Sequence, residues 1–387
     1  MFQTIIGYVL GEPVYVLRGG DSGFSTQGDV LVNETADGVD LNTIWSDVAA
    51  ALSIYNTERS TIASILSYRT TNTADAVPQS ISYDSFEEAS EFGVPTAMRE
   101  SPDVLLMGYD FKDYDKATRF TWKFLRDATA EQVNSVVNRV LEADNRRVTG
   151  KILDRLFNPA ERANEFGAKV FGLWTGTDGL GPLPYLGKEF PTSTNHYLPT
   201  GGALIDSGDV EGAIKLITDK GYGRQPGTQL LILANPQEGE LIQTWKAGET
   251  NNNSQIAKHD FVRSATAPAY LTQDNIVGKV PPGEYNGLPV EGSYGPAWLI
   301  QSEFIPAGWF TVVASGGPNS TLNPVAMREH AKPQYQGLRL LAGKQPGYPL
   351  QESFFARGFG TGVRFRGAAV CVQVTTNASY TAPVIAM

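Results

Sequence analysis

The side chains best suited to catalysis or metal binding are few in this chain, and their spacing fits neither task. The 387 residues include three histidines and one cysteine. His196, His259 and His330 stand alone, without H-x-H, HExxH or CxxC spacing, so we predict no zinc or iron site. Cys371 lies between valines in an apolar run, which predicts a buried and unreactive thiol.

Glycine and carboxylate patterns give no stronger sign of an enzyme. The GFGTG segment at Gly358, Gly360 and Gly362 resembles half of a dinucleotide fingerprint, but no helix-forming stretch follows it to hold a pyrophosphate. We interpret these glycines as backbone freedom at the start of a strand. The sequence contains no G-x-S-x-G elbow and no P-loop lysine motif. Among 41 acidic residues some pair is always available for glycoside hydrolysis, so the presence of such a pair gives no evidence for that activity. We predict no catalytic, cofactor-binding or metal-binding residues.

Composition indicates a folded chain with many turns. Hydrophobic residues make up 41% of the chain and aromatic residues 10%, enough for a substantial core, while 40 glycines and 23 prolines favour a strand-rich body. The net charge of −10 argues against sequence-specific binding of nucleic acid, which needs a basic face, but it is compatible with enclosing nucleic acid. The sequence shows neither a signal-peptide pattern nor a run of 18 apolar residues, so we predict neither export nor a membrane span.

A long helix over residues 129–157 is the element around which the chain is organised. Thr129 and Gln132 form a capping-box pattern, in which the hydroxyl and the amide each bind a free backbone N–H. Apolar residues then recur at i, i+3, i+4 and i+7, and Asn158-Pro159 ends the run. A helix of this length is roughly 43 Å long at 1.5 Å per residue. We interpret it as a strut.

An aromatic strand and a long hairpin are predicted before this helix. In TRFTWKFL (Thr118–Leu125), Phe120, Trp122 and Phe124 alternate with polar residues, which places three aromatic side chains on one face of a strand. From residue 80 to residue 125 the pattern is that of a hairpin whose tip is marked by glycine and proline. A two-stranded ribbon is only marginally stable alone, so we expect it to lie on another chain. Its acidic flank (Glu87, Glu88 and Glu91) is interpreted as a solvated face.

Local signals predict the other elements. Before the hairpin we expect an extended arm with local strands over residues 1–34, a helix capped by Asp40 and a further turn or two through Leu66. After the strut we expect a helix capped by Ser207, a buried strand at Leu230–Leu233 and a helix opened by Pro236, the rhythm of an α/β layer. Beyond them we expect a loop system over 246–296, strands at Trp298–Gln301 and Trp309–Ala314, a weak helix over Pro324–Ala331 and a final strand over Val363–Val374 with a bulge at Gly367.

This order of elements resembles the major capsid proteins of tailed bacteriophages, whose fold is shared with encapsulin shells and the herpesvirus capsid floor. The motifs that carry the resemblance are TRFTWKFL running into the helix at Thr129, and ARGFGTGVRFRGAAV (Ala356–Val370). At the level of amino-acid sequence, the chain is similar to capsid proteins from phages of actinobacteria. The resemblance implies an α+β fold with an N-terminal arm, an extended β-hairpin loop, a peripheral domain with a long spine helix, and an axial domain.

The resemblance also implies a division of the chain. Residues 1–78 would form the N-terminal arm with its helix, 79–126 the extended loop that reaches over a neighbouring subunit, 127–204 the peripheral domain with the spine helix 129–157, 205–346 the axial domain, and 347–387 the return to the peripheral domain. Subunits of this family assemble as pentamers and hexamers into an icosahedral shell around double-stranded DNA. Implied partners are other copies of the chain, a portal protein at one vertex, a separate scaffold protein and a decoration protein. The implied location is the virion, after assembly in the host cytoplasm, without a membrane.

Two features found in some family members are not expected here. Those members join subunits by a Lys–Asn bond from a lysine on the extended loop, but residues 91–110 contain no lysine and the nearest is Lys112. We therefore predict no cross-link near the tip. Other members carry an N-terminal scaffolding segment that is removed. Because Met1 is retained and only about 40 residues precede the first predicted helix, we expect no cleavage and a separate scaffold.

Five residues are predicted as contacts between subunits, and two other functions stay open. The predicted contacts are Phe111, Trp122, Phe124, Arg364 and Arg366, with packing inside the chain as the alternative for the aromatic residues. The first alternative function is an encapsulin-like compartment with protein cargo. The second is a β-rich protein that binds or cleaves glycans, because six tryptophans and 16 tyrosines are available to stack on sugars.

Overall fold

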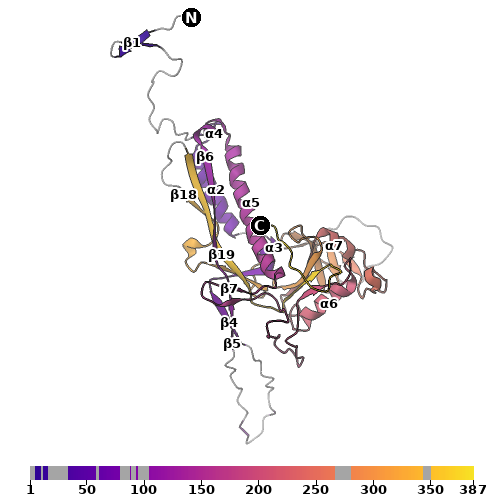
Figure 1. Ribbon diagram of the computed structural model, residues 1–387. Coiled ribbons are helices and arrows are strands. Elements are labelled where there is room, and N and C mark those ends of the chain that lie inside the picture. The colour runs from indigo at the N-terminus through magenta and orange to yellow at the C-terminus, as the bar shows by residue number, and fades with distance from the viewer. Residues whose placement is uncertain are drawn as a thin grey trace. The chain divides into compact units, whose positions relative to one another are not determined.

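The computed structural model describes residues 5–9, 12–15, 34–57, 61–78, 88, 93–94, 104–265, 280–342 and 350–387. The fold is α+β, as predicted (Figure 1). The chain forms two compact units: the first comprises Met1–Ala51, Lys116–Asn138 and Leu340–Phe355, and the second comprises Leu52–Asp115, Arg139–Arg339 and Ala356–Met387. None of the helices in the described ranges combines the length and the apolar character that crossing a bilayer requires.

The N-terminal elements follow the sequence prediction where the structure describes them. Strand β1 (Ile5–Val9) pairs antiparallel with β2 (Glu12–Tyr15), which confirms local strands in the arm. Helix α2 (Leu41–Thr57) begins after Asp40, whose Oδ1 accepts a hydrogen bond from the backbone N of Asn42 at 2.7 Å. Helix α3 (Thr61–Leu66) supplies the predicted extra turns.

The aromatic strand ends at Thr121 and does not continue to Leu125. Strand β6 (Lys112–Thr121) is followed by the short helix α4 (Trp122–Asp127). The Oγ1 of Thr121 accepts a hydrogen bond from the backbone N of Phe124 at 3.1 Å and so caps this helix. The prediction of one aromatic strand face over Thr118–Leu125 is therefore wrong beyond Thr121, because a local cap changes the period of the backbone.

Helix α5 (Ala130–Phe157) confirms the predicted strut, including its cap. The backbone N of Thr129 donates to Oε1 of Gln132 at 3.0 Å, and the backbone N of Gln132 donates to Oγ1 of Thr129 at 3.4 Å. Its 28 residues give a length of about 42 Å. The buried apolar side chains in its C-terminal part are those of Val148, Ile152, Leu153, Leu156 and Phe157.

The second unit contains a seven-stranded sheet with both faces covered. Its order is β11 (Phe261–Arg263), β14 (Gly292–Tyr294), β15 (Ala297–Gln301), β10 (Gln229–Ala234), β16 (Trp309–Ser315), β20 (Ala369–Gln373) and β9 (Tyr197–Pro199). The central strand β10 is parallel to β15 and antiparallel to β16. Alternate side chains of these strands enter two apolar clusters, one with α6 (Ser207–Thr218) and α7 (Pro236–Ile242), the other with α3 and the C-terminal part of α5. The sheet is thus the middle of three layers.

The helix–strand–helix rhythm predicted over residues 205–245 is confirmed as α6, β10 and α7, with one change of cap. Asp206, not Ser207, caps α6: its Oδ1 accepts from the backbone N of Asp209, and Oδ2 of Asp209 accepts from the backbone N of Asp206, both at 3.0 Å. The predicted loop system over 246–296 is only partly a loop, since it supplies the sheet strands β11 and β14. Residues 266–279 of that stretch lie outside the described residues.

A second sheet corrects two further predictions. Its order is β18 (Arg339–Ala342), β19 (Leu350–Val363), β17 (Val325–Glu329) and β3 (Ser67–Thr70), and β6 also pairs with β19. The predicted helix over Pro324–Ala331 is wrong, because β17 is buried between β19 and β3 and this context overrides local propensity. The predicted final strand is also wrong as one strand. β19 ends at Val363, a turn containing Gly367 follows, and β20 belongs to the other sheet.

Strands β4 (Ala74–Pro78) and β5 (Val104–Gly108) pair at the base of a hairpin that begins before the predicted start at residue 80. They are antiparallel, with Pro78 opposite Val104. The prediction that its second arm continues to residue 125 is wrong, because β6 pairs with β19. Pro95 and Pro102, which mark the predicted tip, lie outside the described residues. The remaining elements are β7 (Arg162–Ala163), β8 (Lys169–Val170), β12 (Glu284–Tyr285), β13 (Leu288–Pro289), η1 (Asn252–Ser254) and η2 (Pro333–Tyr335).

Candidate assembly surface

Two of the groups best suited to chemistry, His196 and Cys371, lie in the core. Across the described ranges, no cluster of histidine, cysteine, aspartate and glutamate could hold a metal ion. The Nδ1 of buried His196 donates to the backbone O of Ala369 at 2.6 Å. Burial, reinforced by the nearby charge of Lys220, lowers the pKa of His196 to about 3. Cys371 is buried as predicted, and burial raises the pKa of its thiol. Both side chains therefore act as packed, uncharged groups at neutral pH.

The glycines of the GFGTG segment lie inside β19, where they allow another part of the chain to cross at close range. A Cβ atom at Gly360 would lie 1.6 Å from the backbone O of Asp110. Cβ atoms at Gly358 and Gly362 would meet Phe111, Asp113 or Tyr109 at 2.5–2.7 Å. Residues at i, i+2 and i+4 share one face of a strand, so the three glycines together clear a path for the segment between β5 and β6.

Arg366 lies in the turn between β19 and β20 and is bound from several sides. Its Nη2 is 2.5 Å from Oδ2 of Asp178 and 3.2 Å from the backbone O of Leu173. Its Cζ lies 4.0 Å from the ring centroid of Trp174. Burial lowers the pKa of Arg366, while the Asp178 carboxylate opposes this shift. Nη1 is buried, and no described residue hydrogen-bonds to it.

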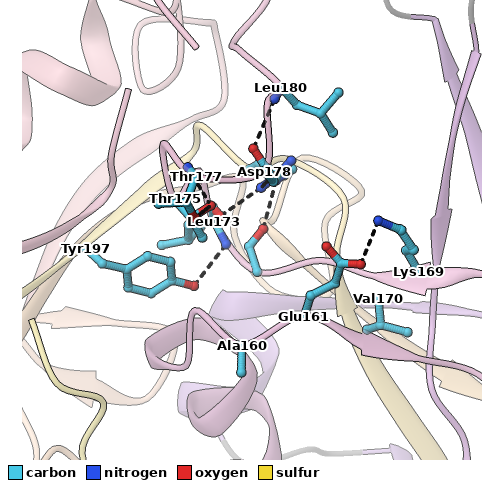
Figure 2. A network of polar contacts seen from close by, with 12 residues as sticks. Ala160, Glu161, Lys169, Val170, Leu173, Thr175, Thr177, Asp178, Leu180 and Tyr197 are labelled. Carbon is cyan, nitrogen blue, oxygen red and sulfur yellow. Dashed lines mark hydrogen bonds and ion pairs between the residues drawn. The ribbon is translucent and has the colours of Figure 1, made fainter. Parts of the chain in front are cut away.

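The loop that carries Asp178 is itself fixed by polar contacts (Figure 2). The backbone N of Leu180 donates to Oδ1 of Asp178 at 3.1 Å. In the same loop the Oγ1 atoms of Thr177 and Thr175 are 3.1 Å apart. The hydroxyl of Tyr197 accepts a hydrogen bond from the backbone N of Leu173 at 3.0 Å. The Arg366 side chain is thus held within the chain through Nε and Nη2, while Nη1 has no partner among the described residues.

Arg364, in the same turn, is linked to the base of the hairpin. Its Nη1 is 3.5 Å from Oδ2 of Asp75 in β4, and that oxygen also accepts from the hydroxyl of Tyr109 at 2.6 Å. The hydroxyl of Tyr68 in β3 is 3.2 Å from that of Tyr109. Burial and the neighbouring Tyr68 and Asp75 raise the pKa of Tyr109. The network therefore links β3, β4 and the turn after β19 at the base of the hairpin.

The three predicted aromatic contacts differ in environment. Half-buried Phe111 packs under the guanidinium of Arg328, whose Cζ is 5.2 Å from the ring centroid. Phe124 is 37% exposed and stacks on Phe120 with centroids 5.7 Å apart. Trp122 begins α4, but its side chain lies outside the described residues. All five positions stay predictions as contacts between subunits.

Exposed apolar side chains on the hairpin base and a nearby turn were missed by sequence reasoning. Val104 and Leu106 in β5 are 51% and 57% exposed. Leu186 is 87% exposed with φ of 46°, a conformation that is uncommon for a side chain of this size. The turn could have been found from the glycine that follows it, Gly187, but exposure could not.

Comparison with known proteins places the chain. No protein-family model and no curated protein matches it. Among solved structures it is similar to one from Mycobacterium phage Patience, with 37% identity, a TM-score of 0.70, and coverage of 95% of this chain and 97% of that chain. It is also similar to the capsid of a native GTA particle, with 14% identity, a TM-score of 0.46 and coverage of 82% and 91%. A third similarity is to the SrpI encapsulin of Synechococcus elongatus PCC 7942, with 11% identity, a TM-score of 0.45 and coverage of 87% and 98%.

The full-length match to the mycobacteriophage structure and the α+β fold define a shell-forming capsid protein. The chain belongs to the major capsid proteins of tailed bacteriophages, and its resemblance to those of actinobacterial phages is confirmed. It is a structural protein of the virion capsid that associates with copies of itself.

Proposed function

We propose that this protein assembles as pentamers and hexamers into an icosahedral shell that encloses double-stranded DNA, and that it has no catalytic activity. The observation that carries the proposal is the 37% identity to the mycobacteriophage structure over 95% of the chain. The exposed apolar residues of β5 support it, since a ribbon with such a surface gains stability by lying on a neighbour. The net charge of −10 suits a wall that contains DNA without binding it tightly.

The division of labour within the chain is part of this proposal. Residues 79–126 reach over a neighbouring subunit, 127–204 and 347–387 form the peripheral domain, and 205–346 form the axial domain at the centre of each capsomer. Residues 1–78 form the arm. Head-to-tail contacts of this kind close into rings when the rotation between subunits closes. A portal protein occupies one vertex, and a separate scaffold and a decoration protein are the other expected partners, with assembly in the host cytoplasm.

Electron microscopy tests the proposal directly. The protein is expressed alone and with the other head proteins of its phage, separated by size exclusion and viewed in negative stain. Shells, tubes, or rings of five and six subunits are the expected result. A monomer of 41.9 kDa under every condition would contradict the proposal.

The contents of purified shells discriminate the encapsulin-like alternative. A genome-containing shell yields nuclease-protected double-stranded DNA, whereas a compartment yields a stoichiometric cargo protein. The glycan-binding or glycan-cleaving alternative is tested on the monomer. Retention or hydrolysis of a polysaccharide would favour it.

A further inference from the structure

A cavity of about 290 Å³ lies beside the hairpin base and the turn between β19 and β20. Its walls are largely apolar and aromatic, and include Val77, Leu105, Met107, Trp174, Tyr185 and Phe365. The charged residues in its lining are Lys220, Arg364 and Arg366, and no carboxylate from the described ranges lines it. A site of this kind favours a ligand that combines an apolar group with negative charge.

Two of these cations have unused capacity for an anion. Lys220 is only 8% exposed, and its Nζ donates to the backbone O of Leu216 at 2.8 Å. Burial, together with the nearby charges of Lys188 and Lys215, lowers the pKa of Lys220 to about 8. The buried Nη1 of Arg366 has no hydrogen-bond acceptor among the described residues. A buried donor without an acceptor costs free energy, so a carboxylate that reached the cavity would be stabilised by both groups.

The chain itself contains a segment of matching chemistry. Residues 84–91 read Asp-Ser-Phe-Glu-Glu-Ala-Ser-Glu, and residues 70–98 contain no lysine or arginine. This segment belongs to the stretch between β4 and β5. The last paired residues of these two strands are Pro78 and Val104. In the hairpin predicted from the sequence, Phe86 would stand about 26 Å beyond Pro78 at 3.3 Å per residue. A segment extended in this way would lead away from the cavity of its own chain, so the sequence prediction favours the cavity of a second copy as its binding site.

We infer that the cavity receives residues 84–91 of a second copy of the chain. Phe86 enters between the aromatic walls, and the carboxylates of Glu87 and Glu88 pair with Lys220 and with Nη1 of Arg366. This inference rests on the proposed function, because the shell is what brings two copies together. It also gives the acidic flank of the hairpin a partner in place of solvent.

Photo-cross-linking identifies the occupant. Tyr185 is 36% exposed on the cavity lining and is replaced by p-benzoylphenylalanine. Shells are assembled from equal amounts of ¹⁵N-labelled and unlabelled subunits, irradiated, digested and analysed by mass spectrometry. The expected products join Tyr185 of one chain to residues 84–91 of another, in mixed-isotope pairs. Cross-links within one chain, or to a different segment, would overturn the inference and leave the shell proposal intact.

A binding measurement tests the same contact without assembly. A fluorescent peptide of residues 82–93 is titrated with the unassembled protein, with a peptide carrying glutamine in place of Glu87 and Glu88 as its control. Binding is expected for the native peptide and at least tenfold weaker for the control and for Lys220→Glu. The matched variant Lys246→Glu changes an exposed lysine outside the lining and is expected to bind normally. Equal affinity for both peptides would contradict the inference, whether or not shells form.

Discussion

The imidazole of His196 lies in the core beside β20, where it is held by one hydrogen bond to the backbone O of Ala369. Its Nε2 is buried, and no described residue accepts a hydrogen bond from it or donates one to it. Protonation would therefore place a second N–H and a full charge where neither has a partner, near Lys220. Because of this arrangement, the stability of the folded chain should depend on pH through His196.

We expect His196 to destabilise the fold progressively as the pH falls. The folded pKa of about 3 lies below the ordinary value of 6.5, so the unfolded chain binds more protons between these two values. The free energy of unfolding should fall by about 1.4 kcal/mol per pH unit in that window through this group. Denaturant unfolding of the unassembled protein at several pH values measures the slope.

Substitution isolates the contribution of this residue from other titrations. His196→Gln should flatten the pH dependence between about pH 6 and 3, even if it lowers stability at neutral pH. Identical slopes for the wild type and His196→Gln would show that the imidazole is not neutral in the folded chain.

At the scale of elements, the end of the chain is packed against the long helix α5. Gly150 faces this segment: a Cβ atom there would lie 2.6 Å from the backbone O of Ala386. The hydroxyl of Tyr380 donates to the backbone O of Phe157 at 2.8 Å, and the Nε1 of Trp309 donates to the backbone O of Thr381 at 3.1 Å. The C-terminal segment is therefore a packed part of the second unit although it has no regular secondary structure.

Two glycine-to-alanine changes in helices should have opposite effects. Gly150→Ala gains about 1 kcal/mol of helix propensity but forces the C-terminal backbone away, and overpacking of this kind costs about 1–3 kcal/mol. Net destabilisation and faster carboxypeptidase digestion are expected. Gly212→Ala in α6, where no atom lies within 4 Å of the added Cβ, should stabilise by up to about 1 kcal/mol. Chemical unfolding of both variants measures the difference, and stabilisation by Gly150→Ala would contradict the packing argument.

Local signals predicted these elements well, and contacts distant in sequence account for the failures. Thr129 with Gln132 and Asp40 are caps whose partners lie within three residues, so they can be found in the sequence. The segment Pro324–Ala331 became a strand because β3 and β19 lie on either side of it, and no local feature indicates those partners. Among the predicted contacts, Arg364 and Arg366 lie in the same turn. The cavity and the position of Lys220 in it were not predicted, because five stretches of the chain that are distant in sequence form its lining.

At the scale of the whole molecule, the base of the hairpin carries apolar side chains that a single chain leaves exposed. Leu105 and Met107 line the cavity on one side of β5, while Val104 and Leu106 on the other side are about half exposed. In the proposed shell this ribbon would be covered by a neighbouring subunit, and burying a leucine there would contribute about 1.5–3 kcal/mol. Repeated in every subunit, this contribution favours assembly over the free chain.

Leu106→Lys should therefore block assembly without unfolding the subunit. The side chain is 57% exposed in the chain, so a lysine there can stay in water in the free subunit but would be buried in a shell. We expect loss of shells and rings in negative stain, with an unchanged unfolding midpoint for the unassembled protein. Leu106→Ile keeps the apolar surface and should assemble normally. Shells of Leu106→Lys at wild-type yield would show that this face of β5 stays in solvent, and the contact that holds subunits together would then have to be sought at Leu186 or Phe124.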